Sequence, residues 1–281
     1  MQPIVAVIAP GMMGSGVGGR LAQNGVEVRT ALAGRSDASI KRATAAGMAG
    51  ATDAQIAASD FILSIVPPGE APGLADRLAP ALRAAGKKPI YVDCNAVNPA
   101  TVLRIARTIE ETGATFVDGG IIGGPPTPGS KGTKLYVSGP AASRVAELEK
   151  YGLEVKLQAG PIGAASAMKM SYAGITKGFT ALGAAMMLAA ARAGTTDALR
   201  AELSASQPAL HGWLTRAMPK MYSKAYRWVA EMEEIAAFVG EDPAGAKFYQ
   251  GAAELYARIA TDFEGPNKET AMLDAFCAKQ D

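Results

Sequence analysis

Short apolar runs alternate with segments of helical periodicity through the first half of the chain. The apolar runs are bounded by Gly, Pro, Asn or Asp, and they cover residues 4–9, 26–32, 61–66, 90–94 and 115–118. Residues 17–24, 70–85 and 99–112 lie between them and read as helices. Uniformly apolar strands separated by helices are typical of a parallel sheet covered on both faces. With right-handed crossovers, this pattern predicts a doubly wound α/β fold.

The pattern changes in the second half of the chain. A hairpin-like end, residues 134–138 and 154–157 around a helix at 141–151, closes the first half. Residues 164–193 contain mostly Ala, Gly, Met, Leu, Ser and Thr without proline, which predicts one long helix that other helices approach closely. The rest reads as amphipathic helices with breaks near Pro208, Pro219, Pro243 and Gly265-Pro266. We therefore predict an α/β domain over residues 1–160 and an all-α domain over residues 161–281.

Composition excludes several classes of protein. With 49% hydrophobic and 19% charged residues, the 281-residue chain is not intrinsically disordered. A net charge of +2 gives no reason to expect a nucleic-acid partner. The apolar run at residues 178–191 is shorter than the about 20 residues that span a bilayer, and the N-terminus lacks a basic signal-peptide region. We expect a cytoplasmic protein without a membrane partner.

The inventory of reactive side chains is also small. Two cysteines and one histidine, Cys94, Cys277 and His211, make neither a disulfide framework nor a metal site. A hydrolase centred on histidine is disfavoured for the same reason. We expect His211 to be a packed residue and Cys94 to be a small buried hydrophobe.

A glycine-rich loop follows the first predicted strand. Gly11 and Gly14 match the second and third glycines of the dinucleotide-binding fingerprint, and Met12 and Met13 lie between them. Glycine at position 11 lets a pyrophosphate approach the backbone amides, and glycine at position 14 lets the helix pack against the strand. Because the loop joins a strand to a helix, its context is the required one. The first half is therefore predicted to be a Rossmann domain.

The end of the second strand indicates which cofactor binds. NAD-binding domains carry an acidic residue here that accepts hydrogen bonds from the ribose. This chain has Arg35 and Ser36 instead, and Asp37 is slightly too far along. Arg35 can pair with a 2′-phosphate, and Ser36 can donate to it. The sequence therefore favours NADP (NADPH) over NAD.

Several motifs in order resemble the β-hydroxyacid dehydrogenase superfamily, which includes 3-hydroxyisobutyrate and 6-phosphogluconate dehydrogenases and, more distantly, imine reductases. After the glycine loop, the motifs are residues 61–67 ending in Val66-Pro67, residues 93–99 with Asn95, residues 118–124 with Gly123 and Gly124, and residues 160–163 leading to Lys169. The resemblance implies that Val66, Pro67 and Asn95 contact the cofactor. It also implies that Gly123 and Gly124 offer amides to the carboxylate of a small anionic substrate.

The resemblance also implies the catalytic residue. Lys169 matches the lysine that passes a proton to or from the substrate oxygen. Its apolar helix would desolvate the ammonium and lower its pKa. Tyr172 follows at i+3 and is the second catalytic candidate, whereas Lys177 is expected at the surface. Arg227 is a candidate anion-binding residue from the helical domain.

Two departures from the family pattern affect the substrate. The serine and the asparagine that contact substrate in the family are replaced by Ile122 and Ala173. The tail around residues 224–234 is similar to a poorly characterised branch of the superfamily.

The leading hypothesis is an NADP(H)-dependent oxidoreductase acting on a β-hydroxy acid or its carbonyl. An imine reductase and a non-catalytic NADP-binding sensor remain alternatives, and we expect a homodimer formed through the helical domain.

Overall fold

The computed structural model describes residues 2–278 and divides the chain into two compact units, Met1–Met170 and Ser171–Asp281. The predicted domain boundary after residue 160 lies ten residues before this division. The first unit is an α/β structure and the second is helical, as the sequence predicts.

A mostly parallel sheet with the strand order β3-β2-β1-β4-β5-β6-β7-β8 forms the centre of the first unit. Its strands are β1 (Ile4–Ile8), β2 (Glu27–Thr30), β3 (Met48–Gly50), β4 (Phe61–Ser64), β5 (Ile90–Asp93), β6 (Thr115–Ile122), β7 (Lys134–Ser138) and β8 (Glu154–Leu157). The strand order reverses beside β1, so the carboxyl ends of β1 and β4 border the crevice in which doubly wound folds bind ligands.

The sheet ends differently from the predicted hairpin. The antiparallel pair is β6 with β7, whereas β7 and β8 run parallel. Two parallel strands need a crossover connection, which α6 (Ala142–Val145) and the 3₁₀ helix η2 (Ala146–Tyr151) supply. The single helix predicted over residues 141–151 is therefore divided into these two pieces.

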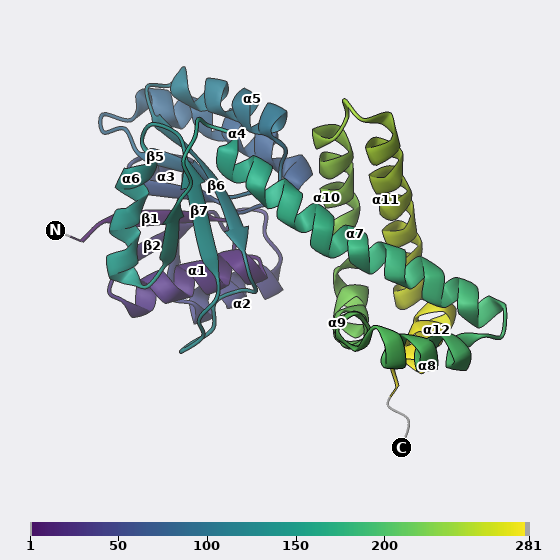
Figure 1. The fold of residues 1–281 in the computed structure, drawn as a ribbon. Helices are drawn as coiled ribbons and strands as arrows, with labels where there is room; N and C mark the ends of the chain where they lie inside the picture. The colour runs from purple at the N-terminus through teal and green to yellow at the C-terminus, as the bar shows by residue number, and fades with distance from the viewer. Residues whose placement is uncertain (1, 279–281) are drawn as a thin grey trace. The chain divides into compact units, whose positions relative to one another are not determined.

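Helices cover both faces of the sheet (Figure 1). On one face, α1 (Met12–Gln23), α2 (Asp37–Ala45) and α6 pack on an apolar cluster that includes Val17 and Leu21. On the other face, α3 (Asp53–Ala57), α4 (Ala71–Ala84) and α5 (Pro99–Glu110) pack on a cluster that includes Leu78 and Ile105. The short 3₁₀ helix η1 (Pro68–Glu70) precedes α4. The uniformly apolar strands are buried from both sides, as their sequences require.

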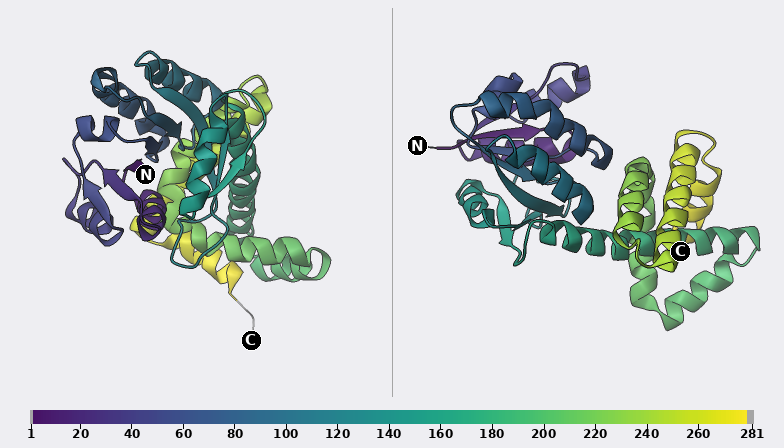
Figure 2. Two further views of the ribbon diagram at one scale, coloured as in Figure 1. Left: turned by 90° about the vertical axis from the view of Figure 1, so that its left-hand side faces the viewer. Right: turned by 90° about the horizontal axis from the view of Figure 1, so that it is seen from above.

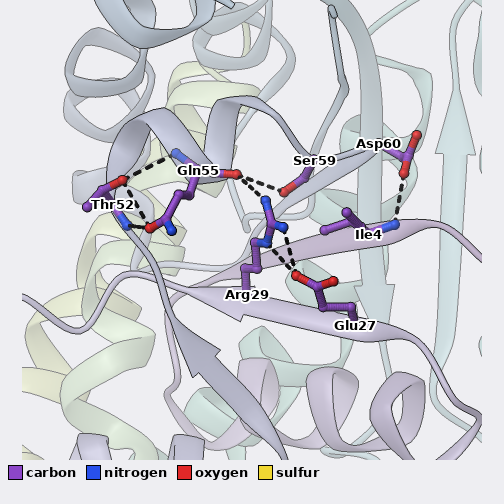
Figure 3. A network of polar contacts seen from close by, with 7 residues as sticks. All are labelled: Ile4, Glu27, Arg29, Thr52, Gln55, Ser59 and Asp60. Atoms are coloured by element: carbon purple, nitrogen blue, oxygen red, sulfur yellow. Dashed lines mark hydrogen bonds and ion pairs between the residues drawn. The ribbon is translucent and has the colours of Figure 1, made fainter.

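A polar network joins α3 to the start of the sheet (Figure 3). The Arg29 guanidinium on β2 donates to Glu27 at 2.8 Å and to the Gln55 carbonyl at 2.8 Å. Thr52 and Gln55 form a reciprocal capping box at the first turn of α3, and Ser59 donates to the same Gln55 carbonyl. Arg29 thus connects β2 to α3.

The second unit consists of helices. It contains most of α7 (Ala164–Arg192), followed by α8 (Thr196–Ser206), α9 (Pro208–Met221), η3 (Tyr222–Lys224), α10 (Ala225–Phe238), α11 (Pro243–Glu264) and α12 (Lys268–Cys277). Helices α10 and α11 lie side by side as an antiparallel pair (Figures 1 and 2). The predicted breaks at Pro208 and Pro243 are helix starts, whereas Pro219 lies inside α9, which ends two residues later.

Glycines on α7 allow other helices to approach it closely. A Cβ at Gly174 or Gly178 would lie 2.9–3.0 Å from the Tyr249 side chain of α11, and one at Gly183 would lie 2.5 Å from Leu214 of α9. The prediction of a helix approached closely by its neighbours is confirmed at these positions.

By length and composition alone, α7 is also long and apolar enough to cross a membrane. It has 29 residues, and its most apolar window has a mean hydropathy of 1.3 with 44% of the window buried. Core helices of soluble proteins meet the same criteria, so this property is weak evidence for a membrane.

Candidate functional site

The loop between β1 and α1 leaves room for a ligand at Gly11. Gly11 is the N-cap of α1, and no side chain from residues 2–278 caps this helix end. A Cβ at Gly11 would have no atom within 4 Å, whereas one at Gly14 would lie 1.9 Å from the Ala9 carbonyl oxygen. Gly14 is therefore required for packing α1 against β1. The open, uncapped helix end at Gly11 suits the pyrophosphate of a dinucleotide.

The two methionines of this loop lie in different surroundings. The Met12 side chain is 64% exposed, and Met13 packs against the apolar cluster beneath α1. Helix α1 begins at Met12, five residues before the helix predicted from periodicity alone. The glycine fingerprint explains the difference, because glycines lack the apolar side chains from which helical periodicity is recognised.

Two arginines and two serines gather where β2 leads into α2. Ser36 is the N-cap of α2, and its hydroxyl interacts with the Ser39 hydroxyl at 3.2 Å. Arg42 donates to the Ser39 hydroxyl at 2.9 Å and to the Pro10 carbonyl at 3.3 Å, so it connects α2 with the glycine loop. Arg35 directly precedes Ser36 and is half-buried. The arrangement provides cationic and hydroxyl donors next to the glycine loop, as a phosphate monoester requires.

Arg42 was not found by the sequence reasoning, although a signal existed. Ser39 and Arg42 are three residues apart on the predicted continuation of the cap, which places their side chains on the same side of α2. Arg35 also lines a cavity of about 260 Å³ on the other side of the loop. Its walls are Arg35, Val66, Glu70, Gly73, Leu74 and Arg77. The predicted cofactor residues Arg35 and Val66 therefore border one space.

Asn95 holds the carboxyl ends of β4 and β5 together. Its side-chain oxygen accepts from the Val66 amide at 2.6 Å, and its amide nitrogen donates to Ser64 at 2.8 Å and to Asp93 at 3.0 Å. The Asn95 side chain is buried, and both its amide hydrogens are committed to protein acceptors. The structure thus shows Asn95 fixing the turn that leads into Pro67, whereas its predicted contact with the cofactor stays a prediction.

Asp93 is a fully buried carboxyl at the end of β5. Burial raises the pKa of Asp93 to about 7, and the nearby Asp118 charge acts in the same direction. Hydrogen bonds from the Asn95 backbone and side chain oppose this effect. Burial and the same two carboxylates also raise the pKa of the Cys94 thiol well above its usual range. Cys94 is buried as predicted, and its thiol is neutral at physiological pH.

A second buried carboxylate, Asp118 on β6, fixes the start of α7. It accepts from the Gly163 amide at 2.9 Å, from the Ser166 amide at 3.1 Å and from the Ser166 hydroxyl at 2.5 Å. The Ser138 hydroxyl on β7 donates to Asp118 at 2.8 Å and accepts from the Ala165 amide at 3.0 Å. Asp118 and Ser138 are paired across the two strands. The first amides of a helix have no partner within the helix. At the start of α7 they donate to the Asp118 carboxylate, whose negative charge is also favourable at the positive end of the helix dipole.

The start of α7 presses Lys169 against β6. A Cβ at Gly120 would lie 3.0 Å from the Lys169 Cβ and 3.2 Å from the Ala165 carbonyl oxygen, so only glycine permits this spacing. The Lys169 ammonium donates to the Ile121 carbonyl, and its side chain is half-buried. Lys169 therefore lies at the end of β6, immediately before the predicted substrate loop.

The loop that begins with Ile122, Gly123 and Gly124 is held by contacts to α1. Gly123 has a φ of 115°, and a Cβ there would lie 2.4 Å from the Gly132 carbonyl oxygen. Gly124 accepts from the Thr133 hydroxyl at 2.5 Å. Arg20 on α1 donates to the carbonyls of Thr127 and Ser130, further along the loop, at 2.8 and 3.0 Å. Sequence reasoning missed Arg20, because its partners are more than 100 residues away.

A cavity of about 290 Å³ lies between this loop, α1 and the sheet. Its apolar walls come from α1 and from strand ends, and include Val17, Ile65, Cys94, Ile121 and Leu135. Arg20, Lys131 and Thr133 supply polar groups along its border. An apolar cavity with a few polar groups, at the carboxyl ends of parallel strands, is the usual setting for a flat organic ligand.

The remaining predicted site residues belong to the second unit. Tyr172 is 50% exposed, Ala173 is buried, and the Arg227 guanidinium lies 5.6 Å from the centre of the Tyr226 ring. Their roles in catalysis and substrate binding stay predictions. No group of three His, Cys, Asp or Glu side chains suited to a metal ion occurs within residues 2–278.

Lys177 differs from its prediction as a surface lysine. Its side chain is only 17% exposed, it forms an ion pair with Glu231 of α10, and its ammonium lies 5.0 Å from the centre of the Trp228 ring. Burial lowers the pKa of Lys177 despite the opposing effect of Glu231. The Glu231 carboxylate of α10 thus pairs with a lysine on α7. The periodicity of one helix does not reveal which helix packs against it.

Comparison with protein families matches two regions of the chain. Residues 4–151 match the NAD binding domain of 6-phosphogluconate dehydrogenase, and residues 190–259 match a domain of unknown function, DUF1932. A 28.5 kDa protein of Methanothermus fervidus is 32% identical over 176 residues. That alignment covers 62% of this chain and 66% of the relative.

Solved structures resemble nearly the whole chain. A conserved protein of unknown function, described as similar to 3-hydroxyacid dehydrogenases, is 28% identical with a TM-score of 0.68 over 92% of this chain and 97% of that one. The 3-hydroxyisobutyrate dehydrogenase of Mycobacterium tuberculosis is 19% identical with a TM-score of 0.72 over 99% and 100%. An imine reductase of Myxococcus stipitatus, solved with NADP+, is 20% identical with a TM-score of 0.57 over 98% and 100%. The last two similarities show the fold alone.

The Asp118 network leads to a stability prediction. In Asp118→Ala, the buried amides of Gly163 and Ser166 lose their acceptor, and unpaired buried groups cost roughly 1–3 kcal/mol each. We expect urea unfolding to show a loss of at least about 2 kcal/mol. Asp76→Ala, on the exposed side of α4, is the control and should change little. An Asp118→Ala protein as stable as the unmodified chain would contradict this role.

Proposed function

Because the chain belongs to the family that shares the NAD binding domain of 6-phosphogluconate dehydrogenase, we propose that it is an NADP(H)-dependent oxidoreductase acting on a β-hydroxy acid or its carbonyl. One observation carries the proposal: Lys169 on α7 is held at the end of β6, beside the Gly123-Gly124 loop, and β6 belongs to the sheet whose strand β1 leads into Gly11. The nicotinamide cofactor, when bound, supplies or accepts the hydride.

The residues of the first unit suit such a cofactor. The helix end at Gly11 would hold the pyrophosphate, and Arg35, Ser36 and Arg42 would hold a 2′-phosphate. Val66 and Pro67 follow β4 at the border of the cavity that Arg35 also lines. The preference for NADP rests on these donors and on the lack of an acidic residue at the end of β2.

Lys169 has the chemistry of a proton donor in this setting. Negative charge develops on the substrate oxygen as a carbonyl is reduced, and an ammonium can donate a hydrogen bond and then a proton to it. In the opposite direction, the neutral amine accepts the hydroxyl proton. The Ile121 carbonyl orients the Lys169 side chain in the structure. The amides of Gly123 and Gly124 are suited to the carboxylate of an anionic substrate, with Ile122 as an apolar neighbour.

An imine substrate is the second candidate, and Ile122 favours it. Isoleucine cannot donate a hydrogen bond to a carboxylate, and NADP+ is the ligand of an imine reductase with this fold. An NADP-binding sensor without turnover is the third candidate. A screen of hydroxy acids, carbonyls and imines for NADPH oxidation separates the three, because a sensor oxidises NADPH with none of them.

We further propose that the chain forms a homodimer through its helical unit. A stripe of exposed apolar side chains runs along α7, and it consists of Tyr172, Ile175, Phe179, Leu182 and Met186. Their spacing of three and four residues places them on one face of the helix. An exposed apolar stripe of this kind is typical of a protein interface. Packing against a second copy would also explain the apolar composition of α7 in a cytoplasmic protein without a membrane partner.

The cofactor prediction concerns the phosphate group alone. We expect NADPH to bind at least tenfold more tightly than NADH, about 1.4 kcal/mol, because only NADPH presents a 2′-phosphate to Arg35 and Arg42. Arg35→Ala and Arg42→Ala should each weaken NADPH binding and leave NADH binding nearly unchanged, as measured by calorimetry. Arg83→Ala, on α4, is the control. Equal affinities for the two cofactors would refute the assignment.

The catalytic prediction concerns Lys169. A positioned general acid contributes about 10²–10⁴ in rate, so Lys169→Met should lower kcat at least a hundredfold on any substrate found in the screen. NADPH affinity should change little, because the cofactor's phosphates are held at other residues. Lys156→Met, which removes an exposed lysine on β8, is the matched control. If the Lys169 variant keeps most of its turnover, the proton comes from Tyr172 or water, and the imine-reductase candidate becomes the better one.

The assembly prediction concerns Ile175, whose side chain is 72% exposed at the middle of the stripe. A charge there would be buried in a dimer without a partner, so Ile175→Glu should shift sedimentation from dimer to monomer at micromolar concentration. Leu103→Glu alters an apolar side chain on α5 that is 44% exposed, and it should leave the dimer intact. A monomeric unmodified chain at that concentration would disprove the proposal.

A further inference from the structure

The loop between β6 and β7, residues 123–133, packs directly on helix α1. A Cβ at Gly16 of α1 would lie 2.8 Å from the Pro126 carbonyl oxygen and 2.9 Å from Pro126 Cδ, so only glycine permits this approach. Arg20 follows Gly16 by four residues and therefore lies on the same face of α1. The loop thus meets α1 at two positions that are one helical turn apart.

The Arg20 guanidinium holds this loop through its oxygen atoms. It donates to the Thr127 carbonyl at 2.8 Å, to the Ser130 carbonyl at 3.0 Å and to the Ser130 hydroxyl at 3.5 Å. It also donates to the carbonyl of Gly152, which follows η2, at 3.4 Å. Hydrogen bonds from a charged donor are stronger than those between neutral groups. Because these acceptors are carbonyls and a hydroxyl, Arg20 fixes the loop backbone and does not neutralise a carboxylate.

The acceptors of Arg20 belong to one tight turn, Thr127 to Ser130. Proline at its second position and Gly129 at its third, with a φ of 73°, match a type II turn. The Ser130 amide donates to the Thr127 carbonyl at 2.9 Å, and the Ser130 hydroxyl accepts from the Thr127 amide at 2.8 Å. Arg20 therefore holds a preformed unit, because these internal bonds already fix the two residues relative to each other.

The same loop carries Gly123 and Gly124, the residues suited to the carboxylate of a substrate. At the base of the loop, the Thr133 hydroxyl donates to the Gly124 carbonyl at 2.5 Å. Two consecutive prolines, whose rings fix φ, connect Gly124 to the turn that Arg20 holds. Movement of that turn away from α1 would therefore also move Gly123 and Gly124.

We propose that Arg20 is a positioning residue of the oxidoreductase site, where it determines how the Gly123 and Gly124 amides meet the carboxylate of the substrate. Helix α1 begins at the glycine loop that would hold the cofactor pyrophosphate, so a loop docked on α1 keeps these amides at a fixed distance from the cofactor. Arg20 itself touches neither substrate nor cofactor in this role. The proposal rests on the oxidoreductase function proposed for this site.

Hydrogen exchange tests the docking of the loop without cofactor or substrate. In Arg20→Met, NMR should show the amides of residues 127–130 exchanging at least about tenfold faster, because the loop leaves α1 more often once its charged donor is lost. Arg20→Lys keeps a charged donor and should show a smaller increase. Arg107→Met makes the same change on the exposed side of α5 and should show none. Unchanged exchange in Arg20→Met would overturn the proposal.

Gly16→Ala tests the same docking by a second route. Alanine favours a helix more than glycine does, so α1 itself should become more stable. The new Cβ would nevertheless meet Pro126, so we expect the loop amides to exchange faster, as in Arg20→Met. The control is Gly251→Ala on α11, where a Cβ would have no atom within 4 Å. Loop exchange that is unchanged or slower in Gly16→Ala would contradict docking on this face of α1.

Steady-state kinetics test the role in substrate binding. Amides that bind the carboxylate equally in the ground state and the transition state affect KM and not kcat. On a carboxylic acid from the substrate screen, Arg20→Met should raise KM at least about tenfold with kcat and the Kd of NADPH nearly unchanged, and Arg20→Lys should recover part of the loss. A fall in kcat at unchanged KM would overturn this role.

The two measurements separate a failure of this proposal from a failure of the proposed function. If the unmodified chain turns over no carboxylic acid, the oxidoreductase function on such acids and the substrate role of Arg20 are refuted together, whereas the exchange rates still report the docking. If it does turn one over and Arg20→Met changes neither KM nor loop exchange, the function stands and the role of Arg20 is refuted.

Discussion

The contact between β6 and the first two turns of α7 is the constraint on which the candidate site depends. Gly120 lets the helix backbone and the Lys169 side chain approach the strand, because any Cβ there would lie only 3.0 Å from Lys169. Asp118 sets the axial position of the helix by accepting hydrogen bonds at its start. With α7 fixed in this way, the Lys169 ammonium lies at the Ile121 carbonyl rather than in solvent. One glycine and one carboxylate thus determine where the proposed acid can act.

Asp93 and Asp118 are partners across adjacent strands, yet their surroundings differ. Asp118 receives hydrogen bonds from two backbone amides and two hydroxyls, which compensate a buried charge. Asp93 receives hydrogen bonds from the Asn95 backbone and side chain, and burial raises the pKa of Asp93 to about 7. A carboxyl with a raised folded-state pKa favours the fold most when it is protonated. Its contribution to stability therefore falls as pH rises toward 7.

Local chemistry explains what could be predicted from the sequence. Gly14 is informative because a Cβ there would lie 1.9 Å from the Ala9 carbonyl oxygen, a contact within the same turn from β1 to α1, whereas Gly11 is informative because it leaves the start of α1 open. Lys169 was identified through its resemblance to a family motif, and its contact with β6 depends on Gly120 from a distant strand. Arg20 was missed, and Lys177 was wrongly predicted at the surface, because their partners lie elsewhere in the fold. The periodicity of a helix shows which of its own residues share a face. It does not show which residue of another element lies opposite Arg20 or Lys177.

The side chains of the second unit are less constrained than those that hold α7 against β6. Gly174, Gly178 and Gly183 let α9 and α11 pack closely on α7. These glycines determine how closely the helices approach, but not which side chains line the spaces between them. The side chains that face the resulting spaces can therefore change without loss of the packing. The α/β unit is more tightly specified, because Gly14, Gly120 and Asp118 each make a contact there that depends on the chemistry of that residue.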